Sequence, residues 1–299
     1  MLAKGRSLSA MQEDTSMEGV AGAALWLLSD LGRSTTGEVV HVDAGFHMMG
    51  LPSEEEAAQP QSAQPQGAEM AFTYMGEGLE RRVRPLAESI GVKALIQADV
   101  TDDASMDAAF AEIEKTFGTL DFVVHSIAFA NKDELKGSFV ENTTREGFLT
   151  AMNVSAFSFV DVAKRASAIM PNGGSMISMT YLGSERTIPN YNTMGVAKAA
   201  LEAATRYIAR DLGPKGIRVN AISAGAMRTL SLAGIAGGRG MISQGRAFSA
   251  LKQDTTMEGV AGCALWLLSD LGASTTGEIV HVDAGFHMIG MAEPEAGEG

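Results

Sequence analysis

The sequence predicts an α/β protein built on a doubly wound parallel sheet, and two observations carry that prediction. First, short β-branched apolar runs alternate with longer runs of helical periodicity through residues 67–291. Such alternation is typical of a parallel sheet with helices on both faces, a three-layer arrangement. Second, the chain has 299 residues, enough for one large domain of this class.

Each expected element follows from its local pattern. Runs rich in Val, Ile and other apolar residues predict strands that are buried on both faces. The expected strands cover residues 69–75, 93–100, 120–129, 174–181, 217–225 and 277–285. Helical spacing of apolar residues predicts helices over residues 77–91, 102–118, 144–168, 193–213 and 255–270. Gly91 and Gly213 end two of these helices, the second being followed directly by Pro214.

A long internal repeat divides the chain. With an offset of 240, residues 1–50 match residues 241–290 at 37 of 50 positions, so residues 1–50 duplicate the carboxyl-terminal helix–strand segment. In the first copy, Thr15 or Ser16 caps the expected helix, Gly32 ends it, and a short strand follows. A Pro/Gln/Glu-rich linker covers residues 51–66, the main domain covers residues 67–291, and residues 292–299 form an acidic tail.

Composition excludes several classes of function. A net charge of −13 argues against non-specific nucleic-acid binding. The sequence has no run of 18 apolar residues and no signal-peptide pattern at its start, so we expect no membrane span and no secretion. The single cysteine, Cys263, excludes an intrachain disulfide and a cysteine metal cluster, so we expect no metal site, and it fits a reducing, cytoplasmic setting.

One stretch of the chain is basic, although the chain as a whole is acidic. Residues 186–252 contain ten Lys/Arg and two acidic residues, Glu202 and Asp211. These cations are either solvated side chains on several faces or a basic mouth for an acidic partner or a phosphorylated ligand.

Ligands of a doubly wound sheet bind beyond the carboxyl ends of its strands. Four such ends carry candidate residues: Asp99 with Val100, residues 126–130, Tyr181, and residues 226–231. Each set on its own also fits an ordinary loop.

The pair Tyr191 and Lys198 is the sharper signal. Seven residues bring two side chains to within about 20° of each other around a helix, so both face one cleft if the helix begins near Tyr191. An ammonium near a phenol strengthens the phenol as a hydrogen-bond donor and acid, and it can also hold ribose hydroxyls. The alternative is a buried tyrosine and a solvated lysine with no shared role.

Residues 67–291 resemble an enoyl-[acyl-carrier-protein] reductase (NADH) of the short-chain dehydrogenase/reductase superfamily. The resemblance runs through "GAEMAFTY", "DFVVHSIAFANKDELKG", "PNYNTMGVAKAALEA" and "GIRVNAISAG" to "GEIVHVDAGFHMIGM". The Tyr-x6-Lys spacing favours enoyl reduction, because the broader superfamily uses Tyr-x3-Lys and Met194 stands at that position here. The resemblance implies a Rossmann-like fold, an oxidoreductase of fatty-acid biosynthesis and lipid metabolism, and a cytoplasmic homotetramer.

The resemblance also implies a reaction and a site. NADH, rather than NADPH, would reduce a trans-2-enoyl thioester carried on acyl carrier protein, with Tyr191, Tyr181 and Lys198 as catalytic residues. Ala130 would touch the acyl substrate. The implied cofactor-binding residues are Met75, Asp99, Val100, Ile127, Lys198, Met227, Arg228, Thr229, Leu230 and Ser231. The family commonly has proline where Ala226 stands.

Family members begin with a strand, a glycine-containing phosphate loop and a helix ahead of "GAEMAFTY". Here the first copy and the linker stand before Gly67, so we expect the domain to lack that first strand–helix unit and its activity to be impaired. Three placements of the first copy are open: it fills the place of the lost strand, packs against the second copy as a subunit would, or is disordered. A non-catalytic remnant that associates with an intact reductase is the alternative function.

Overall fold

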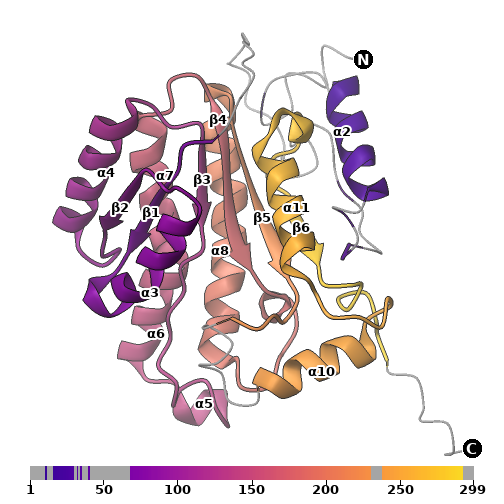
Figure 1. Ribbon diagram of the computed structural model, residues 1–299. Coiled ribbons are helices and arrows are strands. Elements are labelled where there is room, and N and C mark those ends of the chain that lie inside the picture. The colour runs from indigo at the N-terminus through magenta and orange to yellow at the C-terminus, as the bar shows by residue number, and fades with distance from the viewer. Residues whose placement is uncertain are drawn as a thin grey trace, which may run out of the picture.

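The computed structural model describes residues 11, 16–29, 32, 34–35, 40, 68–229 and 238–291, and its fold is α/β (Figure 1). The described strands are β1 (Ala71–Tyr74), β2 (Ala94–Gln97), β3 (Phe122–His125), β4 (Gly174–Thr180), β5 (Ile217–Ala224) and β6 (Ile279–Val282). Every pairing between them is parallel. The predicted class and the succession of strands along the chain are therefore confirmed.

The described helices are α2 (Met17–Leu28), α3 (Gly76–Ser89), α4 (Asp103–Phe117), α5 (Phe139–Asn142), α6 (Arg145–Met152), α7 (Ser158–Ala168), α8 (Asn192–Leu212), α10 (Gly238–Phe248) and α11 (Met257–Leu268). The predicted helices are all found among the described residues, and α5 and α10 are two further helices that the periodicity did not predict. Local capping explains several starts: the Asp102 carboxylate accepts from Ala104 N at 2.9 Å, and the Thr144 hydroxyl accepts from Gly147 N at 3.0 Å.

The predicted helix over residues 144–168 is interrupted. A π-helical turn, η3 (Asn153–Phe157), separates α6 from α7. Inside this turn the Ser155 hydroxyl donates to Phe129 O at 3.0 Å and accepts from Phe129 N at 2.9 Å. The wider turn therefore ties the helix to the loop that follows β3, and π turns of this kind often occur at functional sites.

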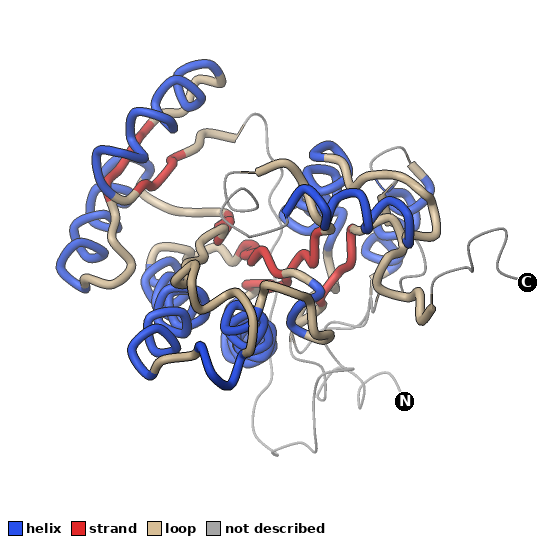
Figure 2. The backbone as a smooth tube through the Cα atoms, turned by 90° about the horizontal axis from the view of Figure 1, so that it is seen from below, coloured by secondary structure: helices blue, strands red, loops and turns tan. Residues whose placement is uncertain are grey.

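The strands form two sheets among the described residues. One sheet has the order β3-β4-β5-β6, and the other contains β1 and β2 (Figure 2). β3 is an edge strand of the larger sheet, and Val124 in its middle is 49% exposed. Parallel strands are usually covered by helices on both faces, so the exposure of Val124 is unusual for the class.

Helices cover both faces of the larger sheet. On one face, α7 and α8 bury Phe159 and Leu201 against Met176 and Val219. On the other face, α11 buries Trp266 against β-strand residues that include Ile222 and Val280. This gives the expected three layers.

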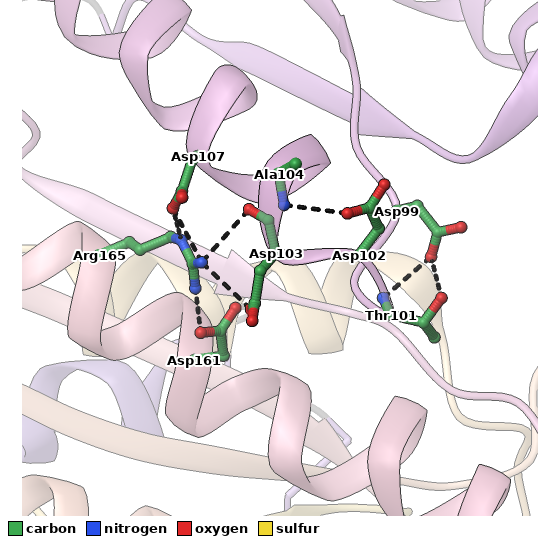
Figure 3. Close-up of polar contacts among 8 residues, drawn as sticks. All are labelled: Asp99, Thr101, Asp102, Asp103, Ala104, Asp107, Asp161 and Arg165. Carbon is green, nitrogen blue, oxygen red and sulfur yellow. Dashed lines mark hydrogen bonds and ion pairs between the residues drawn. The ribbon is translucent and has the colours of Figure 1, made fainter.

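The smaller sheet is joined to the larger one through helices. α4 packs Met106 and Ile113 against β2 and against Val162 of α7. Beside this apolar contact, the Arg165 guanidinium of α7 pairs with Asp161 in its own helix, with Asp107 at 2.9 Å and with Asp103 at 3.4 Å (Figure 3). One cation thus holds the amino-terminal turns of α4 against α7.

The first copy of the repeat lies at the other end of the molecule. α2 packs against α11 and the 3-10 turn η6 (Asp270–Gly272) (Figure 1). Of the three expected placements of the first copy, the described part shows packing against the second copy. The expected strand of the first copy, the linker and the acidic tail lie outside the described residues, apart from Val40, which contacts the cluster around Trp266. In the part of the chain that the structure describes, no helix combines the length and apolar character needed to cross a bilayer.

Candidate functional site

The candidate site lies where β4 ends and α8 begins. Tyr191 is the N-cap residue of α8, and only 6% of its surface is exposed. Its ring packs edge-on against the ring of Tyr181, with centroids 5.0 Å apart. Gly183 permits this packing, because a Cβ there would lie 2.4 Å from Tyr191 Cδ1. The structure thus brings the two predicted tyrosines into contact.

Lys198 approaches the same end of β4 from α8. Its ammonium is buried and donates from Nζ to Met179 O at 2.7 Å. Met179 is in β4, two residues before Tyr181. Tyr191 contacts Tyr181 directly after β4, and Lys198 contacts Met179 within β4, so both side chains lie near the end of this strand.

Burial sets the protonation behaviour of this group. Desolvation lowers the pKa of Lys198 to about 8, against a smaller opposing effect of the Glu202 carboxylate. Desolvation raises the pKa of Tyr181 to about 12, and the Asp283 charge adds to it. The pKa of Tyr191 is raised in the same way, chiefly by burial. Both phenols are therefore protonated donors at neutral pH.

Tyr181 borders a pocket beyond the ends of β5 and β6. Its walls include Gly225 and Ala226 after β5, Asp283 after β6, and Phe286. The Asp283 carboxylate is held in place by the backbone amides of Gly285, Phe286 and His287, at 3.0, 3.1 and 2.8 Å, and by the His287 ring at 2.9 Å. Segments distant in sequence thus converge on one tyrosine.

The loop after β3 carries two of the predicted residues, Ile127 and Ala130. Ser155 fixes this loop through its two hydrogen bonds to Phe129. Ala130 packs against the cluster formed by Leu135, Tyr191 and Met194. The predicted substrate-contact residue therefore lies beside the predicted catalytic tyrosine.

Three predicted cofactor residues follow the strands of the smaller sheet. Met75 caps α3 directly after β1 and is 55% exposed. Asp99 and Val100 follow β2, and Asp99 Oδ1 accepts from Thr101 Oγ1 at 2.7 Å and from Thr101 N at 2.9 Å (Figure 3). These bonds lower the pKa of the Asp99 carboxyl, with the hydroxyl contributing most. The loop is thereby fixed with its carboxylate ionised.

The remaining predicted residues follow β5. Met227 contacts the cluster around Trp266, and Thr229 N donates to Met227 O at 2.8 Å in a tight turn that includes Arg228. Leu230 and Ser231 lie outside the described residues. The structure therefore places only the first three of these five positions.

Three polar residues of the site were not predicted. Glu202 lies one helical turn after Lys198, is buried, and accepts from Thr180 Oγ1 at 2.5 Å. His125 ends β3 and contacts Ser158 Oγ through Nε2 at 2.8 Å, and burial together with the Lys198 charge lowers its pKa to about 3. The third is Ser155. The sequence carries a weak signal for the first, because Glu202 continues the face of α8 that Tyr191 and Lys198 define.

Fold and site together define a nucleotide-binding type of α/β domain, with a Tyr/Tyr/Lys group at the carboxyl end of a parallel sheet. The family model described as enoyl-(acyl carrier protein) reductase matches residues 1–47 and 57–287. The chain belongs to this family.

Individual relatives agree with the assignment. The chain is 52% identical over 231 residues to enoyl-[acyl-carrier-protein] reductase [NADH] 2 of Rhizobium meliloti, covering 77% of this chain and 86% of that protein. It is 47% identical over 249 residues to the Bacillus cereus enoyl-[acyl-carrier-protein] reductase [NADH], covering 82% and 97%. The reductase of Anaplasma phagocytophilum solved in complex with NAD superposes with a TM-score of 0.73 at 50% identity, covering 77% and 87%.

Proposed function

We propose that this chain is an NADH-dependent enoyl-[acyl-carrier-protein] reductase that reduces trans-2-enoyl thioesters in fatty-acid synthesis. The observations that carry the proposal are the contact of Tyr181 with Tyr191 and the hydrogen bond from the buried Lys198 ammonium to Met179 O, two residues before Tyr181. Family membership and the NAD complex of a relative support the choice of cofactor.

The residues of the nicotinamide side fit this cofactor. An ammonium has three N–H donors, so Lys198 can hold Met179 O and ribose hydroxyls together. When bound, NADH supplies the hydride that adds to the β-carbon of the enoyl thioester. Tyr191, protonated at neutral pH, donates to the thioester oxygen where negative charge develops, which is the main electrostatic contribution expected of the protein. Tyr181 orders the ring of Tyr191, and Ala130 borders the acyl chain.

The rest of the cofactor would follow the strand ends. We assign the adenine end to Met75, Asp99 and Val100, and the nicotinamide end to Ile127 and the turn after β5. The assigned residues of that turn are Met227, Arg228, Thr229, Leu230 and Ser231. The fixed loop at Asp99 and the turn at Met227 support these assignments.

We infer that the first copy and the linker stand where family members carry their first strand and phosphate loop. The unpaired edge of β3 among the described residues supports this inference. Loss of two or three charge-assisted hydrogen bonds to the pyrophosphate, about 1.5–3 kcal/mol each, would weaken NADH binding by several decades. We therefore expect an enzyme of reduced activity that binds NADH with a dissociation constant in the micromolar range rather than a lower one.

We also infer cytoplasmic homo-oligomers that act on acyl carrier protein. Large apolar side chains exposed on η3, α7 and α8 support self-association: Phe157 is 54% exposed, Val160 39% and Tyr207 69%. Of the basic stretch over residues 186–252, Lys198 and Arg218 are buried and Arg246 pairs with Asp254. Arg206 and Arg210 are exposed on α8 and are available for an acidic carrier protein.

The test is a titration of the full chain with NADH, followed by its fluorescence, and turnover of a crotonyl thioester. We expect binding in the micromolar range and turnover that Tyr191→Phe and Lys198→Ala abolish. Tyr207→Phe and Lys215→Ala, the same changes at exposed sites, are the controls. No binding at about 1 mM NADH (a free energy weaker than about −4 kcal/mol) would overturn the proposal in favour of a non-catalytic remnant. Turnover of a ketone but not of the thioester would instead indicate a carbonyl reductase.

A further inference from the structure

The two copies of the repeat adopt the same local structure in their described parts. Ser16 caps α2 by accepting from Gly19 N at 2.9 Å, and Thr256 caps α11 by accepting from Gly259 N at 3.1 Å. After each helix the same turn follows. Gly32 N donates to Ser29 O at 3.1 Å in the first copy, and Gly272 N donates to Ser269 O at 3.0 Å in the second.

The contacts between the copies are reciprocal. Ser274 Oγ donates to Ser16 Oγ at 3.4 Å at the start of α2, and Ser34 Oγ lies 3.4 Å from Thr256 Oγ1 at the start of α11. The offset of 240 converts one contact into the other, since Ser16 corresponds to Thr256 and Ser34 to Ser274. The start of each helix therefore meets the turn that follows the other helix.

Glycines of both helices lie close to the opposite copy. A Cβ at Gly19 would lie 2.1 Å from Ala273 O, and a Cβ at Gly259 would lie 2.6 Å from Ser34 Oγ. A Cβ at Gly22 would lie 2.0 Å from Leu271 O. Each helix thus approaches the opposite copy so closely that a side chain at these positions must push it away.

A stacked tryptophan pair marks the centre of the contact. Trp26 and Trp266 occupy equivalent positions of the repeat, so the stack pairs a residue with its own counterpart. Their ring centroids are 4.3 Å apart with an interplanar angle of 6°. Both are almost fully buried, with exposed fractions of 2% and 1%. In an isologous, two-fold interface, residue i of one copy contacts residue j of the other, and residue j of the first copy contacts residue i of the second. The contacts between the two copies follow this pattern.

We infer that the surface formed by α11, η6 and the turn through Ser274 is self-complementary, and that α2 occupies it in cis in place of a second copy of this chain. The chain is then a subunit that caps one of its own association surfaces. The cis occupant prevails because it belongs to the same chain, with an effective concentration of about millimolar, above the micromolar concentration of free chains. This inference does not depend on the proposed reaction. Any assembly of the unaltered chain uses other faces.

The test is to release α2 from the full chain by Gly19→Glu. A glutamate at this position, three residues after the capping Ser16, favours the helix itself, so the substitution acts on docking rather than on α2. Release is checked by limited proteolysis. We expect the molar mass, measured by light scattering, to double, because α11 of one chain then meets α11 of another.

Two variants control this result. Gly19→Glu/Gly259→Glu obstructs both the cis and the trans contact, so we expect its mass to return to that of the unaltered chain. Gly78→Glu places the same change in α3, where nothing lies within 4 Å of the added Cβ, and should leave mass and proteolysis unchanged.

Three outcomes would overturn the inference. The first is a released α2 with no increase in mass. The second is an increase that survives Gly259→Glu, which would place association on another surface. The third is an α2 that stays docked in both Gly19→Glu and Gly22→Glu, which would contradict the close contact itself.

Discussion

The two ends of the molecule are completed in different ways. At the β6 end, α2 packs against α11 with a buried tryptophan stack and two reciprocal side-chain contacts. Among the described residues the larger sheet ends in an edge strand on both sides, and at the β3 end β1 and β2 form a separate sheet instead of extending it. There the connection to the body is an apolar contact of α4 with α7 and the Arg165 ion cluster.

The difference follows from the kind of surface each end presents. A two-fold, self-complementary surface is satisfied by any second copy of itself, and a duplicated segment supplies that copy automatically. A strand edge is satisfied only by a strand in the correct register. Duplication of residues 241–290 therefore completes the first end, while the second is held by its helices.

The largest expected effect compares the two tryptophans of the stack. Trp266→Ala should destabilise the whole domain by about 3–5 kcal/mol, because this side chain belongs to the core beneath α11. Trp26→Ala should lower the free energy of unfolding of the body by much less, since its cost is limited to undocking α2. Urea unfolding followed by far-UV circular dichroism gives both values. Equal midpoint shifts would mean that α2 unfolds with the body as one unit.

The next effect concerns the opposite end. Arg165→Met leaves the Asp161 carboxylate, 10% exposed, without its partner, and should cost about 2–3 kcal/mol. Hydrogen exchange should then accelerate in α4, β1 and β2 but not in α11. Asp161→Asn/Arg165→Met removes the orphaned charge and should recover part of the loss. Uniform acceleration across both ends would contradict the idea that the ion cluster holds one end alone.

The smallest effect near neutral pH is the acid sensitivity of the β3 edge, which grows as the pH falls below 6.5. The pKa of buried His125 is about 3 in the folded chain and near 6.5 when unfolded, so the unfolded state binds the extra proton between these values. Stability from this residue is therefore complete above pH 6.5 and falls as the pH drops, by about 1.4 kcal/mol per unit. His125→Gln should flatten the dependence of unfolding on pH between 6.5 and 4. An unchanged slope would exclude His125 as its source.

Much of the fold could be predicted from the sequence, because local patterns determine local elements. The predicted strands from residues 69–75 to 277–285 each contain an observed strand. The prediction that Tyr191 and Lys198 face one cleft came from their spacing alone, and both side chains contact residues at the end of β4 or directly after it. The interruption of the helix over residues 144–168 was not predicted, because Ser155 makes its hydrogen bonds to a loop 26 residues away. Glu202 and His125 were also missed, because their hydrogen-bond partners, Thr180 and Ser158, are 22 and 33 residues away in the chain.

The sequence by itself determined the α/β class, the order of the strands, the repeat and the Tyr/Lys pair, all of which depend on residues close together in the chain. Only the tertiary structure decided that the described strands divide into two sheets and that α2 lies against α11. Those outcomes depend on which surfaces find a complementary partner in space, and no local pattern specifies that choice.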